Sequence, residues 1–180
     1  ARIQAAFALS YLETALLVLV GAVWLAMSAA SSISAPIGRL VKVADQVAAA
    51  VSIPFVHIAD PVGAAARAAG VQVLGLLGTR FTMEQPFMRE RLEQQFGLKV
   101  LVPGEAERAQ VHRIIYEELC AGQISDVSRK LYQRAIESLA ARGAQAVVLG
   151  CTEIGLLIKS EDSVLPVLDT TALHAAAAVD

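Results

Sequence analysis

The chain has 180 residues, which is enough for one domain or two small ones. Its formal net charge of −2 argues against a nucleic-acid-binding surface, so no nucleic-acid partner is expected. The two cysteines, Cys120 and Cys151, are too few for a disulfide framework, and no cluster of Cys and His has metal-ligand spacing. These features predict a protein of a reducing compartment without a metal site.

The start of the chain is more apolar than the rest. Residues 14–33 carry no charged side chain, and a helix of about 20 apolar residues spans the core of a bilayer. A transmembrane helix is the favoured interpretation, with a buried core helix and a signal peptide as alternatives. Arg39 and Lys42 follow the span and would place the remainder in the cytoplasm, anchored to the inner membrane.

A second helix is expected after this span. Pro36 suits its first turn, and the apolar residues that follow recur in steps of 3 and 4, as in a short coiled coil. Together, residues 1–48 resemble the membrane exit and first HAMP helix of a bacterial sensor histidine kinase. We therefore expect one unit at residues 1–42 and a second at residues 43–180. The apolar seam consists of Ile37, Leu40, Ala44, Val47 and Val51.

The second unit alternates short apolar runs with helical patterns, which predicts an α/β fold with a mostly parallel sheet flanked by helices. Strands are expected at residues 53–58, 71–77, 98–102, 146–149 and 164–168. Helices are expected at 62–69, at 84–96, over a segment ending at Gly122, from Ser125 or Asp126 to Gly143, and from Thr170 onward. The expected apolar face of the helix before Gly143 is Val127, Leu131, Ala135 and Leu139.

A thiol, a hydroxyl and a carboxylate follow one of these predicted strands directly. Cys151, Thr152 and Glu153 come after the strand at 146–149. Ligands of parallel sheets bind beyond the carboxyl ends of the strands, so we expect these side chains at a binding crevice. A helical turn after Cys151 would favour its thiolate over its thiol.

A second polar cluster follows the strand at 71–77. It occupies residues 78–82, and its glycine would allow a ligand to approach the backbone closely. Backbone N–H groups and the hydroxyls of Thr79 and Thr82 would then hold a carboxylate or a phosphate. The two clusters belong to the same edge of the predicted sheet.

Four fragments, in order, resemble the aspartate/glutamate racemase family. They are IPFVHIAD (53–60), GLLGTRFTM (75–83), VVLGCTEIGLL (147–157) and LPVLDTTALHA (165–175), and the resemblance runs over about residues 43–180. It implies a cofactor-independent enzyme with two similar α/β lobes and an active site between them. The second lobe would occupy about residues 62–165, with a remnant of the first lobe beside it. Members often form dimers, so a homodimer is expected.

The resemblance implies proton abstraction from the α-carbon of a small-molecule amino acid, of the aspartate or glutamate type. The family uses one cysteine from each lobe, on opposite faces of that carbon. Cys151 matches the second-lobe cysteine, with Thr152 and Glu153 beside it, and Thr79 and Thr82 match positions that help to hold substrate carboxylates.

The first-lobe cysteine of the family has no counterpart in this sequence. Its motif would fall at residues 37–41, which read IGRLV and contain no thiol. Cys151 alone would exchange the α-proton on one face without inverting the centre, so activity is expected to be impaired. The two resemblances overlap at residues 42–49, which indicates a junction between a membrane segment and a truncated racemase. The alternative function is a membrane-tethered carboxylate-binding or sensory module without turnover.

Overall fold

Four parallel strands in the order β2-β1-β3-β4 form the centre of the structure. The structure, a computed structural model, describes residues 55–179. Every crossover in this order joins parallel strands through helical segments, so the predicted α/β class with a parallel sheet is confirmed. The strands are β1 (Val73–Leu77), β2 (Lys99–Leu101), β3 (Ala146–Leu149) and β4 (Val167–Asp169).

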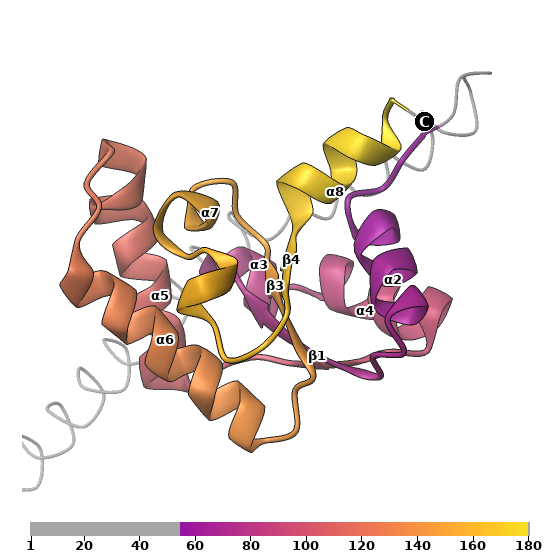
Figure 1. Cartoon of the computed structure of the whole chain (residues 1–180), viewed down its shortest axis with the longest axis horizontal. Helices are drawn as coiled ribbons and strands as arrows, with labels where there is room; N and C mark the ends of the chain where they lie inside the picture. The colour runs from indigo at the N-terminus through magenta and orange to yellow at the C-terminus, as the bar shows by residue number, and fades with distance from the viewer. Residues whose placement is uncertain (1–54, 180) are drawn as a thin grey trace, which may run out of the picture. The chain divides into compact units, whose positions relative to one another are not determined.

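Helices cover both faces of this sheet (Figure 1). One face carries α2 (Ala59–Ala68), α4 (Pro86–Phe96) and α8 (Thr170–Ala177). The other carries α5 (Glu105–Glu117), α6 (Asp126–Ala141) and α7 (Ile154–Leu157). The remaining short elements are α3 (Arg80–Glu84), η1 (Leu119–Ala121) and η2 (Ser160–Asp162).

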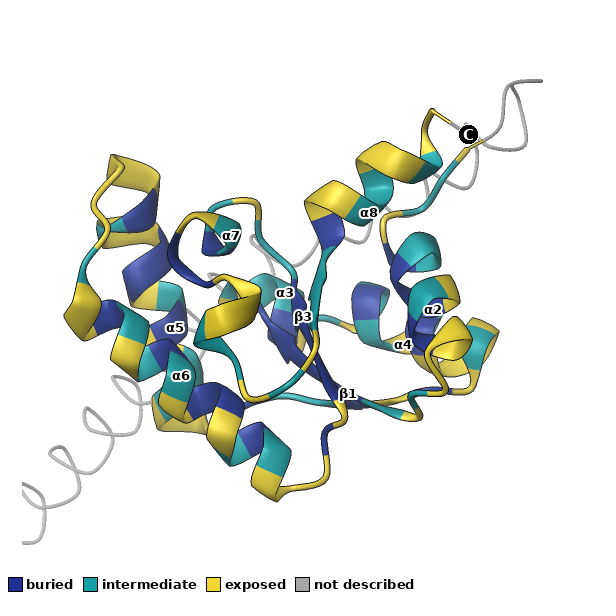
Figure 2. Ribbon diagram, viewed as in Figure 1, coloured by how far each residue is buried: buried dark blue, intermediate teal, exposed yellow. Residues whose placement is uncertain are grey.

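The two central strands are buried on both faces, which explains their continuous apolar sequence. Val147 and Leu149 of β3 point into the core under α5 and α6, whereas Val148 points into the core under α2 and α4. Figure 2 shows these strands in dark blue between helices that are buried on their inner sides. The sheet therefore forms the rigid base on which the segments at its carboxyl edge are mounted.

The predicted strand at 53–58 is wrong over the part that the structure describes. Residues 55–57 form no strand, and Ile58 is the N-cap of α2. The Ala59 N–H donates to Nδ1 of His57 over 3.1 Å, which supports the start of the helix. Pro61 lies in the first turn of α2, where backbone N–H groups make no hydrogen bond within the helix, so the missing N–H of proline costs nothing there. A short apolar run before a proline fits both a strand and the segment that leads into a helix, and periodicity alone cannot separate the two.

The predicted helix at 84–96 starts earlier than expected and is broken. The chain forms α3, then passes through Gln85 in an extended conformation, with ψ 150°, before α4 begins at Pro86. A residue before proline is sterically disfavoured from helical geometry, so Gln85 separates the two helices. Gly97 ends α4 at φ 66°, as predicted.

The buried face of α6 includes Ala135 and Leu139 as predicted, but it is shifted by one residue in the first half of the helix. Val127, expected in the core, is 72% exposed, whereas the polar Ser128 is buried. Tyr132 is fully buried, and its hydroxyl donates to the Val111 carbonyl oxygen over 3.1 Å. Polar side chains can face the core here because each has a hydrogen-bond partner. The buried residues of α6 are Ser128, Tyr132, Ala135, Ile136 and Leu139.

Two other boundaries differ from the predictions. The helix expected to run to Gly122 ends as α5 at Glu117 and continues as η1, which Gly122 ends at φ 71°. The last strand forms at β4 rather than at 164–168, while the final helix begins at Thr170 as predicted. Asp169 is the N-cap of that helix, with its Oδ1 accepting from the Thr171 N–H over 2.8 Å.

The predicted transmembrane helix at 14–33, the HAMP-like seam and the boundary at residue 42 all lie outside the described residues. Within residues 55–179, no helix combines the length and hydropathy that a bilayer crossing needs. The membrane prediction therefore concerns a part of the chain that the structure does not describe.

The corrected face of α6 can be tested by a pair of substitutions. Ile136→Ala should lower the free energy of unfolding by about 2–5 kcal/mol, because it leaves a cavity under the sheet. Val127→Ala should change it by less than about 0.5 kcal/mol, because Val127 is exposed. Equilibrium unfolding in urea measures both. Equal losses in the two variants would contradict the observed face.

Candidate functional site

The carboxyl ends of β1 and β3 meet at two glycines. The Gly150 N–H donates to the Leu77 carbonyl oxygen over 2.7 Å, which extends the pairing of Leu77 with Leu149 by one residue. A Cβ on Gly150 would lie 2.9 Å from that oxygen and 3.0 Å from Cγ2 of Thr82. The glycine therefore lets the Thr82 side chain rest against the backbone that leads into Cys151. The structure brings the two predicted clusters side by side.

Thr79 and Thr82 form a hydroxyl pair at the end of β1. Thr79 is the N-cap of α3, and its Oγ1 accepts from the Thr82 N–H over 3.3 Å. The two Oγ1 atoms lie 3.2 Å apart, so one hydroxyl donates to the other. Because each hydroxyl carries one hydrogen, this mutual bond uses one of the two. We refer to these two residues as the threonine pair.

Part of the sequence-based expectation for this cluster needs correction. The N–H groups of residues 78–82 were expected to face a ligand. The Thr82 N–H is bound to Thr79, and the Arg80 N–H donates to Nδ1 of His112 over 3.1 Å. Two of these donors are therefore used within the protein, and the hydroxyls become the more suitable ligand-binding groups.

Cys151, Thr152 and Glu153 form a tight polar cluster after β3. The Cys151 Sγ donates to Oε2 of Glu153 over 2.9 Å, and the Thr152 hydroxyl donates to the same oxygen over 2.7 Å. The Ile154 N–H bonds back to the Cys151 carbonyl oxygen over 3.2 Å, which closes the turn before α7. Cys151 is half-buried and packs against the hydrophobic core, whereas the next residue, Thr152, is exposed to solvent.

The expected thiolate is not supported by this environment. Burial, together with the hydrogen bond to the Glu153 carboxylate, raises the pKa of Cys151 to about 12 and favours the thiol. The helix after Cys151, α7, has only four residues, so its dipole stabilises a thiolate weakly. The Glu153 carboxylate is hydrogen-bonded to the sulfur, and its negative charge opposes a thiolate more strongly. The hydrogen bonds from Cys151 and Thr152 lower the pKa of Glu153. At neutral pH the pair is a thiol beside a carboxylate.

Asp169 adds a third polar group at this edge of the sheet. A Cβ on Gly155 would lie 2.9 Å from Asp169 Oδ2, so the carboxylate packs closely against α7. The Thr170 hydroxyl donates to the Leu149 carbonyl oxygen over 2.8 Å, which ties the start of α8 to the end of β3. Sequence reasoning placed Asp169 at a strand end but did not include it among the site residues.

A clamp centred on Arg129 fixes α7 and the segment behind it. Arg129 lies on α6, and its Nη1 donates to the Leu157 carbonyl oxygen and to Asp162 Oδ2, the latter over 2.9 Å. The same oxygen of Asp162 accepts from the Lys159 N–H over 2.9 Å. The segment that follows the Cys151 turn is thus held by a side chain of α6.

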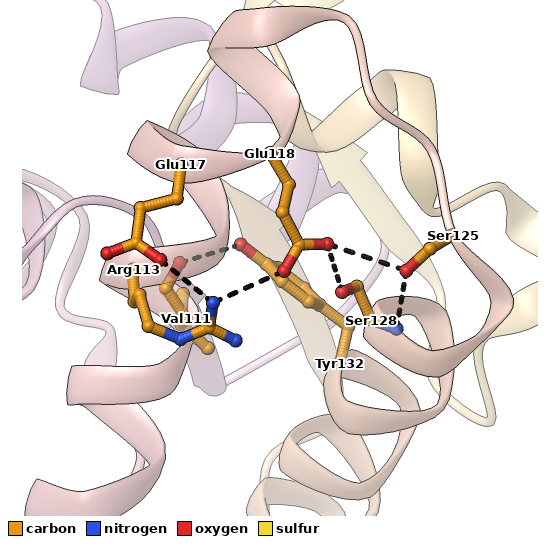
Figure 3. A network of polar contacts seen from close by, with 7 residues as sticks. All are labelled: Val111, Arg113, Glu117, Glu118, Ser125, Ser128 and Tyr132. Carbon is orange, nitrogen blue, oxygen red and sulfur yellow. Dashed lines mark hydrogen bonds and ion pairs between the residues drawn. The ribbon is translucent and has the colours of Figure 1, made fainter.

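A polar network fixes the corner between α5 and α6 (Figure 3). Glu118 accepts hydrogen bonds from the hydroxyls of Ser128 and Ser125, the second over 3.4 Å, and pairs with Arg113 over 3.4 Å. Burial raises the pKa of Tyr132 in this network, and negative charge on Cys151 and Glu118 would raise it further. Tyr132 therefore belongs to the wall behind the Cys151 sulfur.

The other predicted features have separate outcomes. Cys120 is exposed on η1 and takes no part in the cluster. Within residues 55–179, no group of three or more His, Cys, Asp or Glu side chains gathers in a way that would hold a metal ion. The position expected for the opposing proton carrier, residues 37–41, lies outside the described residues.

The electrostatic pairing of Cys151 with Glu153 predicts a measurable change in thiol reactivity. Glu153→Gln removes the negative charge beside the sulfur, so the pKa of Cys151 should fall and its thiolate fraction should rise. We expect alkylation of Cys151 by iodoacetamide to become roughly three- to tenfold faster near neutral pH. Mass spectrometry of the Cys151 peptide measures the rate. Glu161→Gln, at an exposed carboxylate on η2, is the control and should leave the rate unchanged.

Comparison with known proteins gives a consistent result. The sequence matches the Asp/Glu/hydantoin racemase family over residues 41–178. The structure is similar to that of a candidate Asp/Glu racemase from Yersinia pestis, with a TM-score of 0.74 and 50% identity, over 77% of this chain and 60% of that one. An aspartate racemase homologue from Pyrococcus horikoshii OT3 is 34% identical, with a TM-score of 0.69 over 75% of this chain and 59% of its own.

A more distant structure shares the fold. The aspartate racemase of Picrophilus torridus matches with a TM-score of 0.52 and 18% identity, over 69% of this chain and 53% of that one. The chain thus spans less than two thirds of the length of each of these structures. The family match nevertheless includes every strand of the sheet and both polar clusters at its carboxyl edge. The chain belongs to the Asp/Glu/hydantoin racemase family.

Proposed function

We propose that this chain carries the Cys151 half of a cofactor-independent racemase site for an acidic amino acid. In this proposal Cys151 exchanges the α-proton, and Thr79, Thr82, Thr152 and Glu153 surround the substrate. One observation carries it: the Cys151 thiol, hydrogen-bonded to Glu153 over 2.9 Å, follows Gly150, against which Thr82 of the threonine pair packs at the carboxyl edge of the sheet. Family membership supports the reaction class.

The protonation state of Cys151 favours one direction of the proton transfer. Because its pKa is raised to about 12, the resting group is a thiol and therefore a proton donor. In that direction the S–H bond breaks, a C–H bond forms at a planar α-carbanion, and the sulfur is left as a thiolate. The negative charge moves from the carbanion, where the carboxylate had delocalised it, to the sulfur.

The opposite direction requires a thiolate before the C–H bond breaks. An amino-acid substrate brings an ammonium group, and a positive charge near the sulfur lowers a thiol pKa. Exclusion of water strengthens this attraction, because the effective dielectric constant falls. In this account the S–H proton first passes to the Glu153 carboxylate along the existing hydrogen bond, which leaves the sulfur as a thiolate beside a neutral carboxylic acid. The substrate itself would therefore prepare Cys151 to act as a base.

The threonine pair suits the carboxylate side of the substrate. With one hydroxyl hydrogen used in the mutual bond, the second can be donated to a carboxylate oxygen. The Thr79 backbone extends directly from β1 and Gly78, so the hydroxyls lie on a rigid base. A carboxylate held there delocalises the negative charge that develops when the α-proton leaves.

Impaired activity is part of the proposal. Inversion needs a second proton carrier on the far face of the α-carbon, and residues 37–41 hold no thiol where the family resemblance expects one. One carrier alone exchanges the proton on its own face and returns the same enantiomer. The raised pKa of Cys151 also favours a second candidate function, which is binding of a carboxylate ligand without turnover.

Deuterium incorporation separates these functions. The full chain, incubated in D2O with each enantiomer of aspartate and glutamate, should label the α-carbon of one enantiomer without changing its configuration, as followed by NMR and chiral chromatography. Cys151→Ala should slow labelling by at least about 100-fold, the size typical of general acid–base catalysis. Cys120→Ala is the matched control and should leave labelling unchanged, because Cys120 is exposed and takes no part in the hydrogen bonds of the cluster.

Each other outcome has a defined meaning. Ligand binding without labelling would replace the racemase proposal by the binding module. Labelling that survives Cys151→Ala would remove Cys151 from the mechanism. Labelling accompanied by inversion would contradict the impaired half-site.

Membrane attachment through residues 14–33 and a cytoplasmic position of the remainder are a separate proposal. The uncharged stretch of the sequence supports it. After expression of the full chain, the protein should fractionate with membranes and require detergent for extraction. Recovery in the soluble fraction without detergent would contradict the transmembrane proposal.

A further inference from the structure

His112 contacts the threonine turn from another helix. It lies on α5, between the ring of Phe81 at 6.3 Å and the ring of Tyr116 at 4.8 Å, both in edge-to-face geometry. Its Nδ1 accepts the Arg80 N–H over 3.1 Å. Nothing in the sequence pattern singled out this residue. It bonds the backbone immediately after Thr79, although 32 positions separate the two partners in sequence.

This bond supports a helix that cannot hold itself in place. α3 has five residues, and a helix of this length is unstable without external contacts. The first N–H groups of a helix lack partners within it. In α3, His112 accepts from Arg80, and Thr79 Oγ1 accepts from Thr82. The bond from α5 therefore fixes the turn in which the threonine pair is formed.

The charged groups around His112 are already paired with one another. Glu84 of α3 lies 4.0 Å from Arg80 and 3.2 Å from Arg108 of α5. The Arg108–Glu84 pair joins α5 to the far end of α3, whereas His112 joins the two helices at the start of α3. The acceptor role of Nδ1 requires a neutral imidazole with its hydrogen on Nε2.

We propose that His112 is a positioning residue for the substrate carboxylate. It acts through the Arg80 amide, which sets the orientation of the turn and thereby the geometry of the threonine pair. The inference rests on the proposed function, because it concerns the same carboxylate site. His112 itself does not touch the substrate in this account.

Two substitutions of equal shape separate the hydrogen bond from the packing. Asn places an acceptor oxygen where His carries Nδ1, and Leu has the shape of Asn without an acceptor. His112→Asn should keep affinity for aspartate close to that of the unchanged protein. His112→Leu should weaken it roughly three- to tenfold, the effect of one lost neutral hydrogen bond. Calorimetric titration of the full chain with aspartate measures both. Tyr116→Leu removes the neighbouring ring and should leave affinity unchanged.

A measurement without ligand keeps the inference independent of the proposed function. Hydrogen exchange of the Thr82 amide, observed by NMR, should become roughly three- to tenfold faster in His112→Leu but not in His112→Asn. If aspartate does not bind the unchanged protein, the proposed function fails, and the exchange rates alone decide whether His112 orders the turn. Equal exchange in the Asn and Leu variants would overturn the inference. Equal affinity in those variants, or a loss in Tyr116→Leu that matches His112→Leu, would also overturn it.

Discussion

The hydrogen bond from the Gly150 N–H to the Leu77 carbonyl oxygen is the contact on which the candidate site depends. It carries the pairing of β1 and β3 past the last strand residues, at 2.7 Å. Because Gly150 has no side chain, Thr82 packs directly on the backbone there. A larger residue would separate the two turns. The two turns of the candidate site therefore lie side by side because two strand ends can approach without intervening atoms.

The same closeness determines the electrostatics of the site. The Cys151 sulfur is half-buried and faces the Glu153 carboxylate, and both conditions favour the thiol. With this pKa the sulfur keeps its proton at neutral pH, so it can donate a proton to a carbanion. The free protein holds little thiolate and is therefore not prepared for proton abstraction. In the proposed reaction, the thiolate forms when a cationic substrate enters and water leaves. The arrangement would also protect the cysteine from nonspecific oxidation, because the thiolate is the reactive form.

Sequence patterns predicted the layers of the fold and the placement of both polar clusters at the carboxyl ends of strands, for identifiable reasons. β1 and β3 are continuous apolar runs that end at glycines, and reactive residues directly after such strands point to the carboxyl edge. The face of α6 was misjudged because Ser128 and Tyr132 are polar. Their burial depends on Glu118 and on the Val111 carbonyl oxygen, which belong to α5 and its C-cap.

Other features of the site could not be predicted, because they depend on tertiary contacts. The protonation of Cys151 follows from its depth and from the direction of the Glu153 side chain, neither of which is encoded in the local pattern. His112 lies on the amphipathic helix α5, and its hydrogen bond to the Arg80 N–H exists because α3 and α5 pack together. A lone histidine on a helix carries no sequence signal for such a role.

The Arg129 clamp has a consequence for how this family can vary in length. The segment from Cys151 to Asp162 is fastened at both ends, at the end of β3 and at the guanidinium of Arg129. An insertion or deletion inside it would displace the turn that carries Cys151 or break the ion pair between Arg129 and Asp162. The stretch 163–166, between Asp162 and β4, carries no such constraint from Arg129. Natural insertions in the connection from β3 to β4 should therefore accumulate in those few residues, so that this stretch can diverge while the turn after β3 keeps its shape.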